Sequence, residues 1–145
     1  MLRSGLDARV YNHSVWEELA YNIHQRNKRG QVSHPIVIMG HSLGANATFR
    51  MAKYLGDRGI RVKYAVAFDG TRTMIATPNV SRAINYYLPN DSKTNVIKKS
   101  VGFKGTVKNI NVSGIAGISH TKVDKVAKIH RDVLKRTLSL TRKKR

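Results

Sequence analysis

The stretch from residue 35 to residue 48 constrains the fold of this chain more than any other segment. It begins with the apolar run Pro-Ile-Val-Ile-Met, passes through Gly-His-Ser-Leu-Gly at residues 40–44, and continues into small helix formers. A serine at the centre of Gly-x-Ser-x-Gly, between a strand and a helix, is typical of a nucleophile elbow, a strained turn that exposes the serine hydroxyl. The segment therefore predicts an α/β protein in which Ser42 is the nucleophile of an acyl-transfer reaction.

The glycines on either side of Ser42 have a steric explanation. A nucleophile elbow places its serine in a sparsely populated backbone region and brings strand and helix close together, so we expect Gly40 and Gly44 to be needed because they lack side chains. The alternative is a glycine-rich turn that holds an ordinary surface serine. The elbow is favoured by the apolar run before the motif and by an apolar helical stripe after it, at Ala45, Phe49, Ala52 and Leu55.

The charge balance bears on partners rather than on the fold. The chain of 145 residues has 27 lysines and arginines against 8 acidic residues, a net charge of +19. We expect one domain over residues 1–138 and a basic, disordered tail over residues 139–145. The charge predicts non-specific contact with anionic surfaces through that tail. No helix-turn-helix, zinc-finger or aromatic RNA-binding pattern accompanies it, so no specific nucleic-acid partner is expected.

Composition excludes several other kinds of chemistry. The chain has no cysteine, which rules out disulfides, thiolate catalysis and cysteine-based zinc sites. The histidine spacing matches no metal-binding motif, so no metal and no cofactor are predicted. No apolar stretch approaches the roughly 20 residues of a membrane span, and the first residues lack a signal-peptide pattern, which predicts a cytoplasmic protein.

The order of elements predicts a three-layer α/β/α sandwich with a mostly parallel sheet and helices on both faces. Ser14 is the expected N-cap of the first helix. The stretch from residue 70 to residue 105 is rich in Pro, Asn, Ser and Thr, and it is read either as a lid or substrate wall or as irregular packing with one short strand. The expected strands are residues 9–13, 35–39, 62–68 and 106–112, and the expected helices are residues 14–28, 45–55 and 121–138.

A serine nucleophile needs a base and a third group that orients the base, and in this fold class the acid and then the histidine follow the serine in the chain. Asp69 stands at the carboxyl end of a predicted strand, where open α/β sheets place functional side chains. Asp91 is the alternative acid, and Asp69 could instead cap a turn at the strand end. His120 lies on a glycine-containing loop and is the expected base, whereas His130 falls on the apolar stripe of the last helix and is read as a core residue.

The transition state of acyl transfer also needs hydrogen-bond donors for its oxyanion. The backbone N–H of Leu43, directly after the nucleophile, is the expected first donor. The second donor normally comes from a loop after an earlier strand, and the chain has little room for that loop before Pro35. The side chain of His41 is expected to pack within the elbow and to point away from Ser42.

Together, Gly40-His41-Ser42-Leu43-Gly44, Phe68-Asp69 and His120 resemble the α/β-hydrolase superfamily, and in particular its small lipase- and thioesterase-type members. The resemblance implies a triad of Ser42, Asp69 and His120, cleavage of a small acyl ester or thioester through an acyl-enzyme, and no cofactor. Compared with the family pattern, the front of the sheet and its His-Gly oxyanion loop are missing, which predicts a reduced, N-terminally truncated member. Two other classes stay open: a catalytically inactive hydrolase-like binding protein, and a basic protein associated with nucleic acid or an anionic surface.

Overall fold

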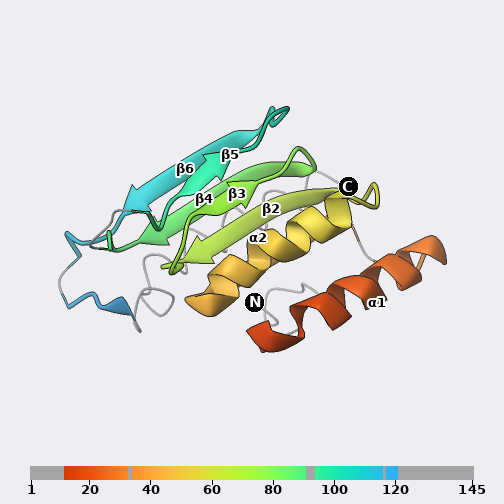
Figure 1. Ribbon diagram of the computed structural model, residues 1–145, viewed down its shortest axis with the longest axis horizontal. Helices are drawn as coiled ribbons and strands as arrows, with labels where there is room; N and C mark the ends of the chain where they lie inside the picture. The colour runs from red at the N-terminus through yellow and green to blue at the C-terminus, as the bar shows by residue number, and fades with distance from the viewer. Residues whose placement is uncertain (1–11, 33, 91–93, 116, 121–145) are drawn as a thin grey trace.

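Figure 1 shows a twisted parallel sheet with two helices laid against it. The computed structural model describes residues 12–32, 34–90, 94–115 and 117–120. The main sheet has the strand order β1-β2-β4-β6 with every pair parallel, and β3 and β5 form a second, two-stranded parallel sheet. The bounds are η2 (His13–Val15, a 3-10 turn), α1 (Trp16–Lys28), β1 (Val37–His41), α2 (Leu43–Gly56), β2 (Val62–Phe68), β3 (Met74–Ala76), β4 (Val80–Tyr87), β5 (Ile97–Lys99) and β6 (Thr106–Asn111).

The β1-α2-β2 unit forms where the sequence pattern is strongest. β2 lies between β1 and β4 and is buried along almost its whole length, which is why its sequence is a nearly continuous apolar run rather than an alternating one. Ala65 and Ala67 face the α2 side, and these small side chains leave room for the helix to pack closely. The predicted strand at residues 62–68 matches β2, and the predicted helix at residues 45–55 matches the body of α2.

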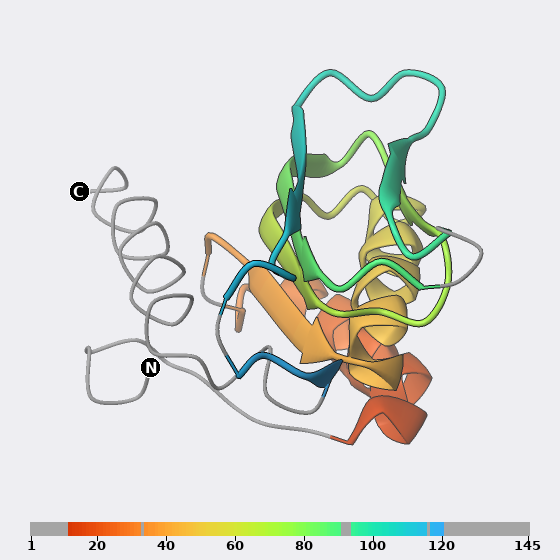
Figure 2. The ribbon, with the colours of Figure 1, turned by 90° about the vertical axis from the view of Figure 1, so that its left-hand side faces the viewer.

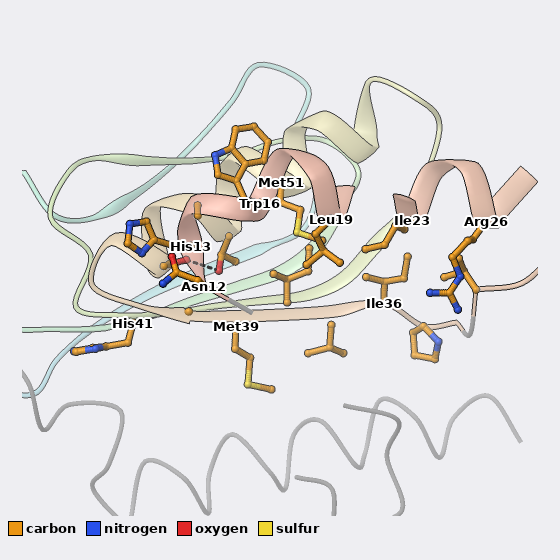
Figure 3. Close-up of a pocket in the computed structure, with 18 of the residues that line it drawn as sticks. Asn12, His13, Trp16, Leu19, Ile23, Arg26, Ile36, Met39, His41 and Met51 are labelled. Atoms are coloured by element: carbon orange, nitrogen blue, oxygen red, sulfur yellow. Dashed lines mark hydrogen bonds between the residues drawn. The ribbon is translucent and has the colours of Figure 1, made fainter. Parts of the chain in front are cut away.

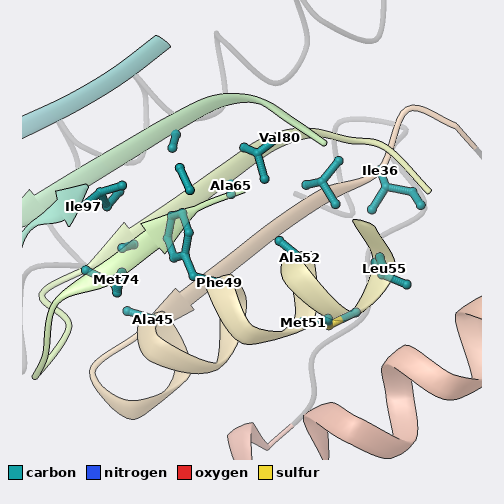
Figure 4. Packing of buried hydrophobic residues seen from close by; sticks show 14 of the residues in the cluster. Ile36, Ala45, Phe49, Met51, Ala52, Leu55, Ala65, Met74, Val80 and Ile97 are labelled. Carbon is teal, nitrogen blue, oxygen red and sulfur yellow. The ribbon is translucent and has the colours of Figure 1, made fainter. Parts of the chain in front are cut away.

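Apolar residues pack on both faces of the main sheet. The cluster on one face lies under α2 and α1, where Phe49 and Leu55 of the helix meet the strands (Figure 4). The cluster on the other face is formed mainly by alternate residues of β2 and β4, such as Tyr64, Val66 and Ile84. This alternation follows from the two-residue repeat of a strand and gives the interior strands two buried faces.

Both described helices lie on the same side of the main sheet (Figure 2). The predicted α/β class with a mostly parallel sheet is confirmed, and the architecture is of the α/β-hydrolase type. The helix expected from Thr121 onward and the basic tail lie outside the described residues. None of the described helices is long and apolar enough to cross a membrane.

The expectation for residues 70–105 was wrong in the parts that the structure describes. This stretch contains the interior strand β4 and the paired strands β3 and β5 instead of a lid or one short strand. The polar residues misled the prediction because some of them are interior. Asn85 on β4 is fully buried, and its amide nitrogen donates to the backbone oxygen of Asn95 at 2.9 Å and to Oδ1 of Asn109 at 3.0 Å.

Smaller corrections concern element ends. Ser14 does not cap the first helix, because the N-cap of α1 is Val15, which makes no side-chain capping bond. Asn12 caps the 3-10 turn ahead of α1, and its Oδ1 accepts from the backbone N–H of Ser14 at 2.9 Å. Most of the strand expected at residues 9–13 lies outside the described residues, and its last residue, His13, belongs to that 3-10 turn. β1 starts two residues later than expected and runs on through the first glycine of the motif to His41.

Candidate active site

Ser42 occupies a sharp turn between β1 and α2. Its backbone has φ 59° and ψ −119°, a conformation that residues with a side chain rarely adopt. Its N–H donates to the carbonyl oxygen of Phe68 at 2.9 Å, so the turn is attached to the end of the neighbouring strand. α2 begins at Leu43, whose backbone N–H belongs to the first helical turn and has no acceptor within the helix.

The two glycines of the motif differ in how much space surrounds them. A Cβ on Gly40 would lie 2.0 Å from the carbonyl oxygen of Gly44 and 2.7 Å from Oγ1 of Thr48, so the backbones of β1 and α2 touch here. Among the residues that the structure describes, a Cβ on Gly44 would meet Cβ of His13 alone, at an ordinary 3.9 Å. Within the described part of the chain, the steric reason expected for both glycines therefore holds for Gly40 and finds no support at Gly44.

Asp69 lies directly after β2, next to the serine turn. Its N–H donates to the carbonyl oxygen of Tyr86 at 2.7 Å, just as Ser42 bonds to the end of β2. Its φ of 53° is left-handed, a conformation that aspartate tolerates better than most residues. Asp69 does not cap the turn that follows, because the N–H of Thr71 donates instead to Oδ1 of Asn46.

His120 joins Ser42 to Asp69. Its Nε2 lies 2.8 Å from Oγ of Ser42, and its Nδ1 lies 2.5 Å from Oδ2 of Asp69. Since an ionised carboxylate can only accept, the proton sits on Nδ1, which leaves Nε2 to accept the serine hydroxyl. The loop that carries His120 is held by Ile115 and Ile118, which pack against the apolar cluster on the sheet face away from α2.

The second carboxylate oxygen of Asp69 is held by groups that sequence reasoning missed. Oδ1 accepts from the backbone N–H of Leu88 at 2.9 Å and from Nδ2 of Asn95 at 3.3 Å. Asn95 is only 2% exposed, and it also donates to the carbonyl oxygen of Leu88 and accepts from the N–H of Asn90. Asp69 itself is 4% exposed, so these partners fix a buried carboxyl in one orientation.

The sequence predicts that the side chain of His41 points away from Ser42, and in the structure this side chain contacts the loop that carries His120. Its Nε2 lies 2.5 Å from the backbone oxygen of His120, and the two rings are 5.1 Å apart between centroids. Because a carbonyl oxygen can only accept, Nε2 of His41 carries the donated proton. The motif residue before the serine thus ties the loop of His120 to the end of β1.

A groove lined by apolar and polar residues runs beside the elbow, between α1 and β1. Its volume is about 640 Å³, and Gly40, His41 and Gly44 line one end of it. Figure 3 shows Trp16, Leu19 and Ile23 of α1 along the groove wall.

The structure brings together four of the residues singled out in the sequence: Ser42, Leu43, Asp69 and His120. The alternative acid Asp91 and the second downstream histidine, His130, lie outside the described residues. The described part of the chain contains no cluster of three or more potential metal ligands.

The parallel sheet, with Ser42 in the turn after β1 and Asp69 directly after β2, is an architecture of the α/β-hydrolase type. A model of the thioesterase domain family matches residues 7–93, and the chain belongs to that family. The family is one of hydrolases that act on acyl thioesters or esters. The matched range includes Ser42 and Asp69 and ends before His120. No curated protein and no solved structure matches the chain.

Proposed function

We propose that this protein is a serine hydrolase that cleaves an acyl thioester or ester through an acyl-enzyme on Ser42. The proposal rests chiefly on one observation, the 2.8 Å contact between Oγ of Ser42 and Nε2 of His120. A serine hydroxyl is a weak nucleophile until a base within hydrogen-bond reach can accept its proton. Asp69 on the other ring nitrogen keeps Nε2 in the accepting tautomer and stabilises the cation that forms on proton transfer.

The reaction then follows from these contacts. Oγ of Ser42 attacks the acyl carbon while His120 takes the proton, and the developing oxyanion accepts from the N–H of Leu43 at the start of α2, where the helix dipole also favours negative charge. The carbon–sulfur or carbon–oxygen bond breaks, and Nε2 returns the proton to the leaving thiol or alcohol. Water attacks the acyl-enzyme with the same base, which releases the carboxylic acid and the free serine.

The groove beside the elbow suits the acyl part of the substrate. Its lining includes the apolar side chains of Trp16, Leu19 and Ile23 beside polar ones such as Asn12, and one end of it reaches the turn that carries Ser42. An acyl chain laid there would leave water and gain free energy with every methylene that is buried. We therefore expect kcat/KM to rise with acyl length over a series of p-nitrophenyl esters and to level off once the groove is filled.

Labelling with a fluorophosphonate probe tests the serine mechanism directly. The wild-type chain should be labelled, Ser42→Ala should not, and Ser113→Ala, which removes an exposed serine after β6, should be labelled like the wild type. Thioester hydrolysis can be followed by thiol release with a disulfide reagent, since the chain has no cysteine to react. Ser42→Ala should lose about 10⁴-fold or more in kcat. A folded wild-type protein that is neither labelled nor active would favour the catalytically inactive binding protein instead.

A further inference from the structure

The end of the sheet opposite Ser42 carries a group of exposed cations. Arg61 directly precedes β2, Arg82 lies near the start of β4, and Lys104 comes just before β6, while Lys98 and Lys99 end β5. All five side chains are exposed, and we call them the basic rim. Asp57, four residues before Arg61, is paired with Lys53, and the described residues 70–90, 94–115 and 117–120 contain no acidic residue.

The contacts between segments show that the rim belongs to one end of the molecule. Arg82 is the register partner of Thr106, the first residue of β6. The guanidinium of Arg61 donates to Oγ of Ser81 at 2.9 Å, and the backbone of Ser81 touches Gly105. In Figure 1 the turn between β5 and β6 accordingly lies at the far end from the arrowheads of β2, β4 and β6. Ser42 follows β1 and Asp69 follows β2, so both residues lie at the arrowhead end.

An aliphatic side chain stands in the middle of this charge. Residues 100–103 form a tight turn closed by a 3.1 Å hydrogen bond from the N–H of Phe103 to the carbonyl oxygen of Ser100. Gly102 has φ 84°, which suits the third position of a type II turn. The second position is Val101, whose side chain is 99% exposed. Proline is common at this position of a type II turn, and here the position presents a fully exposed aliphatic side chain.

We propose that the basic rim and Val101 form a docking site for an anionic lipid surface. A bilayer of acidic lipids presents a plane of negative charge above an apolar layer, and this surface presents cations around one apolar apex. The lysines and arginines would lie among the headgroups while Val101 enters the acyl boundary. A single nucleic-acid strand would be recognised by exposed aromatic platforms, and Phe103, the aromatic residue of this turn, packs partly buried against the core instead.

Docking in this way holds the candidate active site away from the membrane. The strands are parallel, so the turn before β6 and the residues after β1 and β2 lie at opposite ends of one sheet. The surface therefore serves to place the hydrolase at a membrane with its serine facing the aqueous phase. The inference does not depend on the proposed serine chemistry, because the lipid surface and the reacting residues share no side chain.

Sedimentation with vesicles tests the proposal on the full chain. The protein should bind vesicles of phosphatidylcholine mixed with phosphatidylglycerol and should not bind phosphatidylcholine alone. Lys98→Glu/Lys104→Glu should weaken binding about 25-fold or more, because each cation near the surface contributes about fivefold. Lys28→Glu/Arg50→Glu, on the two helices, changes the net charge by the same amount and should weaken binding less than twofold. Equal losses in both double variants would show attraction by net charge alone and would overturn the proposal.

The apex is tested separately, and the absence of native cysteine makes this simple. An environment-sensitive fluorophore on Val101→Cys should shift to the blue on mixed vesicles, whereas the same label on Tyr21→Cys of α1 should not. Val101→Ser should weaken binding about three- to tenfold. If the label at position 101 stays in water while the protein is bound, the docking site is wrong. It is also wrong if the rim variants lose affinity for single-stranded DNA and keep their affinity for vesicles. Should the glutamate variant unfold, Lys98→Gln/Lys104→Gln gives the same comparison with a smaller loss.

Discussion

The two ends of the main sheet illustrate two ways in which a surface can be built. At the end where β1 and β2 finish, side chains from distant segments are joined by short, directional hydrogen bonds, and the polar atoms of Asp69 are held by four separate groups. At the opposite end, Lys98, Lys104 and their neighbours share a region of space and a sign of charge. Directional contacts fail when one atom moves, whereas a field of exposed charge depends on the number and sign of the charges. The first end should therefore be sensitive to single-atom changes and the second should not.

The largest expected effect comes from Asp69→Asn, which replaces one oxygen by a nitrogen. The amide can donate to Nδ1 of His120, which would then present the wrong tautomer to Ser42. We expect kcat to fall by about 10⁴-fold with little change in KM and little loss of stability. Steady-state kinetics on a neutral thioester measures it.

Asp57→Asn is the matched control for that variant. Asp57 is exposed and pairs with Lys53 on α2, far along the chain from the serine turn, so its replacement should leave kcat within twofold. If Asp69→Asn keeps a tenth or more of the wild-type activity, the end of the sheet near Ser42 is not sensitive to single-atom changes and the comparison is wrong. The alternative acid Asp91 would then be the residue to replace.

Gly40→Ala should give the next largest effect, on stability rather than on chemistry. Its Cβ would overlap the carbonyl oxygen of Gly44, so β1 and α2 must separate. We expect the free energy of unfolding to fall by about 3 kcal/mol or more. Gly44→Ala has room for its methyl group and should be neutral, or stabilising by up to about 1 kcal/mol. Urea unfolding of both variants measures the two changes in stability. Equal destabilisation would mean that the close contact between β1 and α2 at Gly40 is not what requires a glycine there.

A third substitution tests whether the hydrogen bond from Asn95 to Asp69 contributes to catalysis. Asn95→Asp keeps the shape of the side chain, removes the donor to Oδ1 of Asp69 and places a second acid beside it. We expect kcat to fall about 10- to 100-fold with KM nearly constant. Asn109→Asp alters a neighbouring, more exposed part of the hydrogen-bond network without touching Asp69, and it should lower stability while keeping kcat within threefold. A similar loss of kcat in both variants would show that the network acts only through folding.

How far the sequence predicts this molecule depends on whether the signal is local. The strand, glycine and helix around Ser42 follow one another in the chain, and β2 is an apolar run, so both could be read directly. β3, β4 and β5 could not. β3 and β5 are only three residues long, and the buried Asn85 of β4 donates its amide to Asn109, which lies far away in sequence. The sequence favours Asp69 by its place at a strand end, and it favours His120 by its place after the acid on a glycine-containing loop. Chain order gives no distance, and the link from Asn95 to Asp69, 26 residues apart, left no local pattern.

The smallest expected effect comes from a variant of the basic rim, at the end of the sheet opposite Ser42. Lys98→Glu/Lys104→Glu reverses two charges of the basic rim, and we expect kcat/KM on a neutral, soluble thioester to stay within twofold at physiological salt. Screening reduces the influence of exposed charges beyond about 8 Å, and the rim lies at the far end of the strands from Ser42. The same assay at low salt is a stricter test, because electrostatic interactions between the rim and the substrate are then less screened. A change in kcat that grows as salt is lowered would mean that the two ends are electrostatically coupled and that the division drawn between them is wrong.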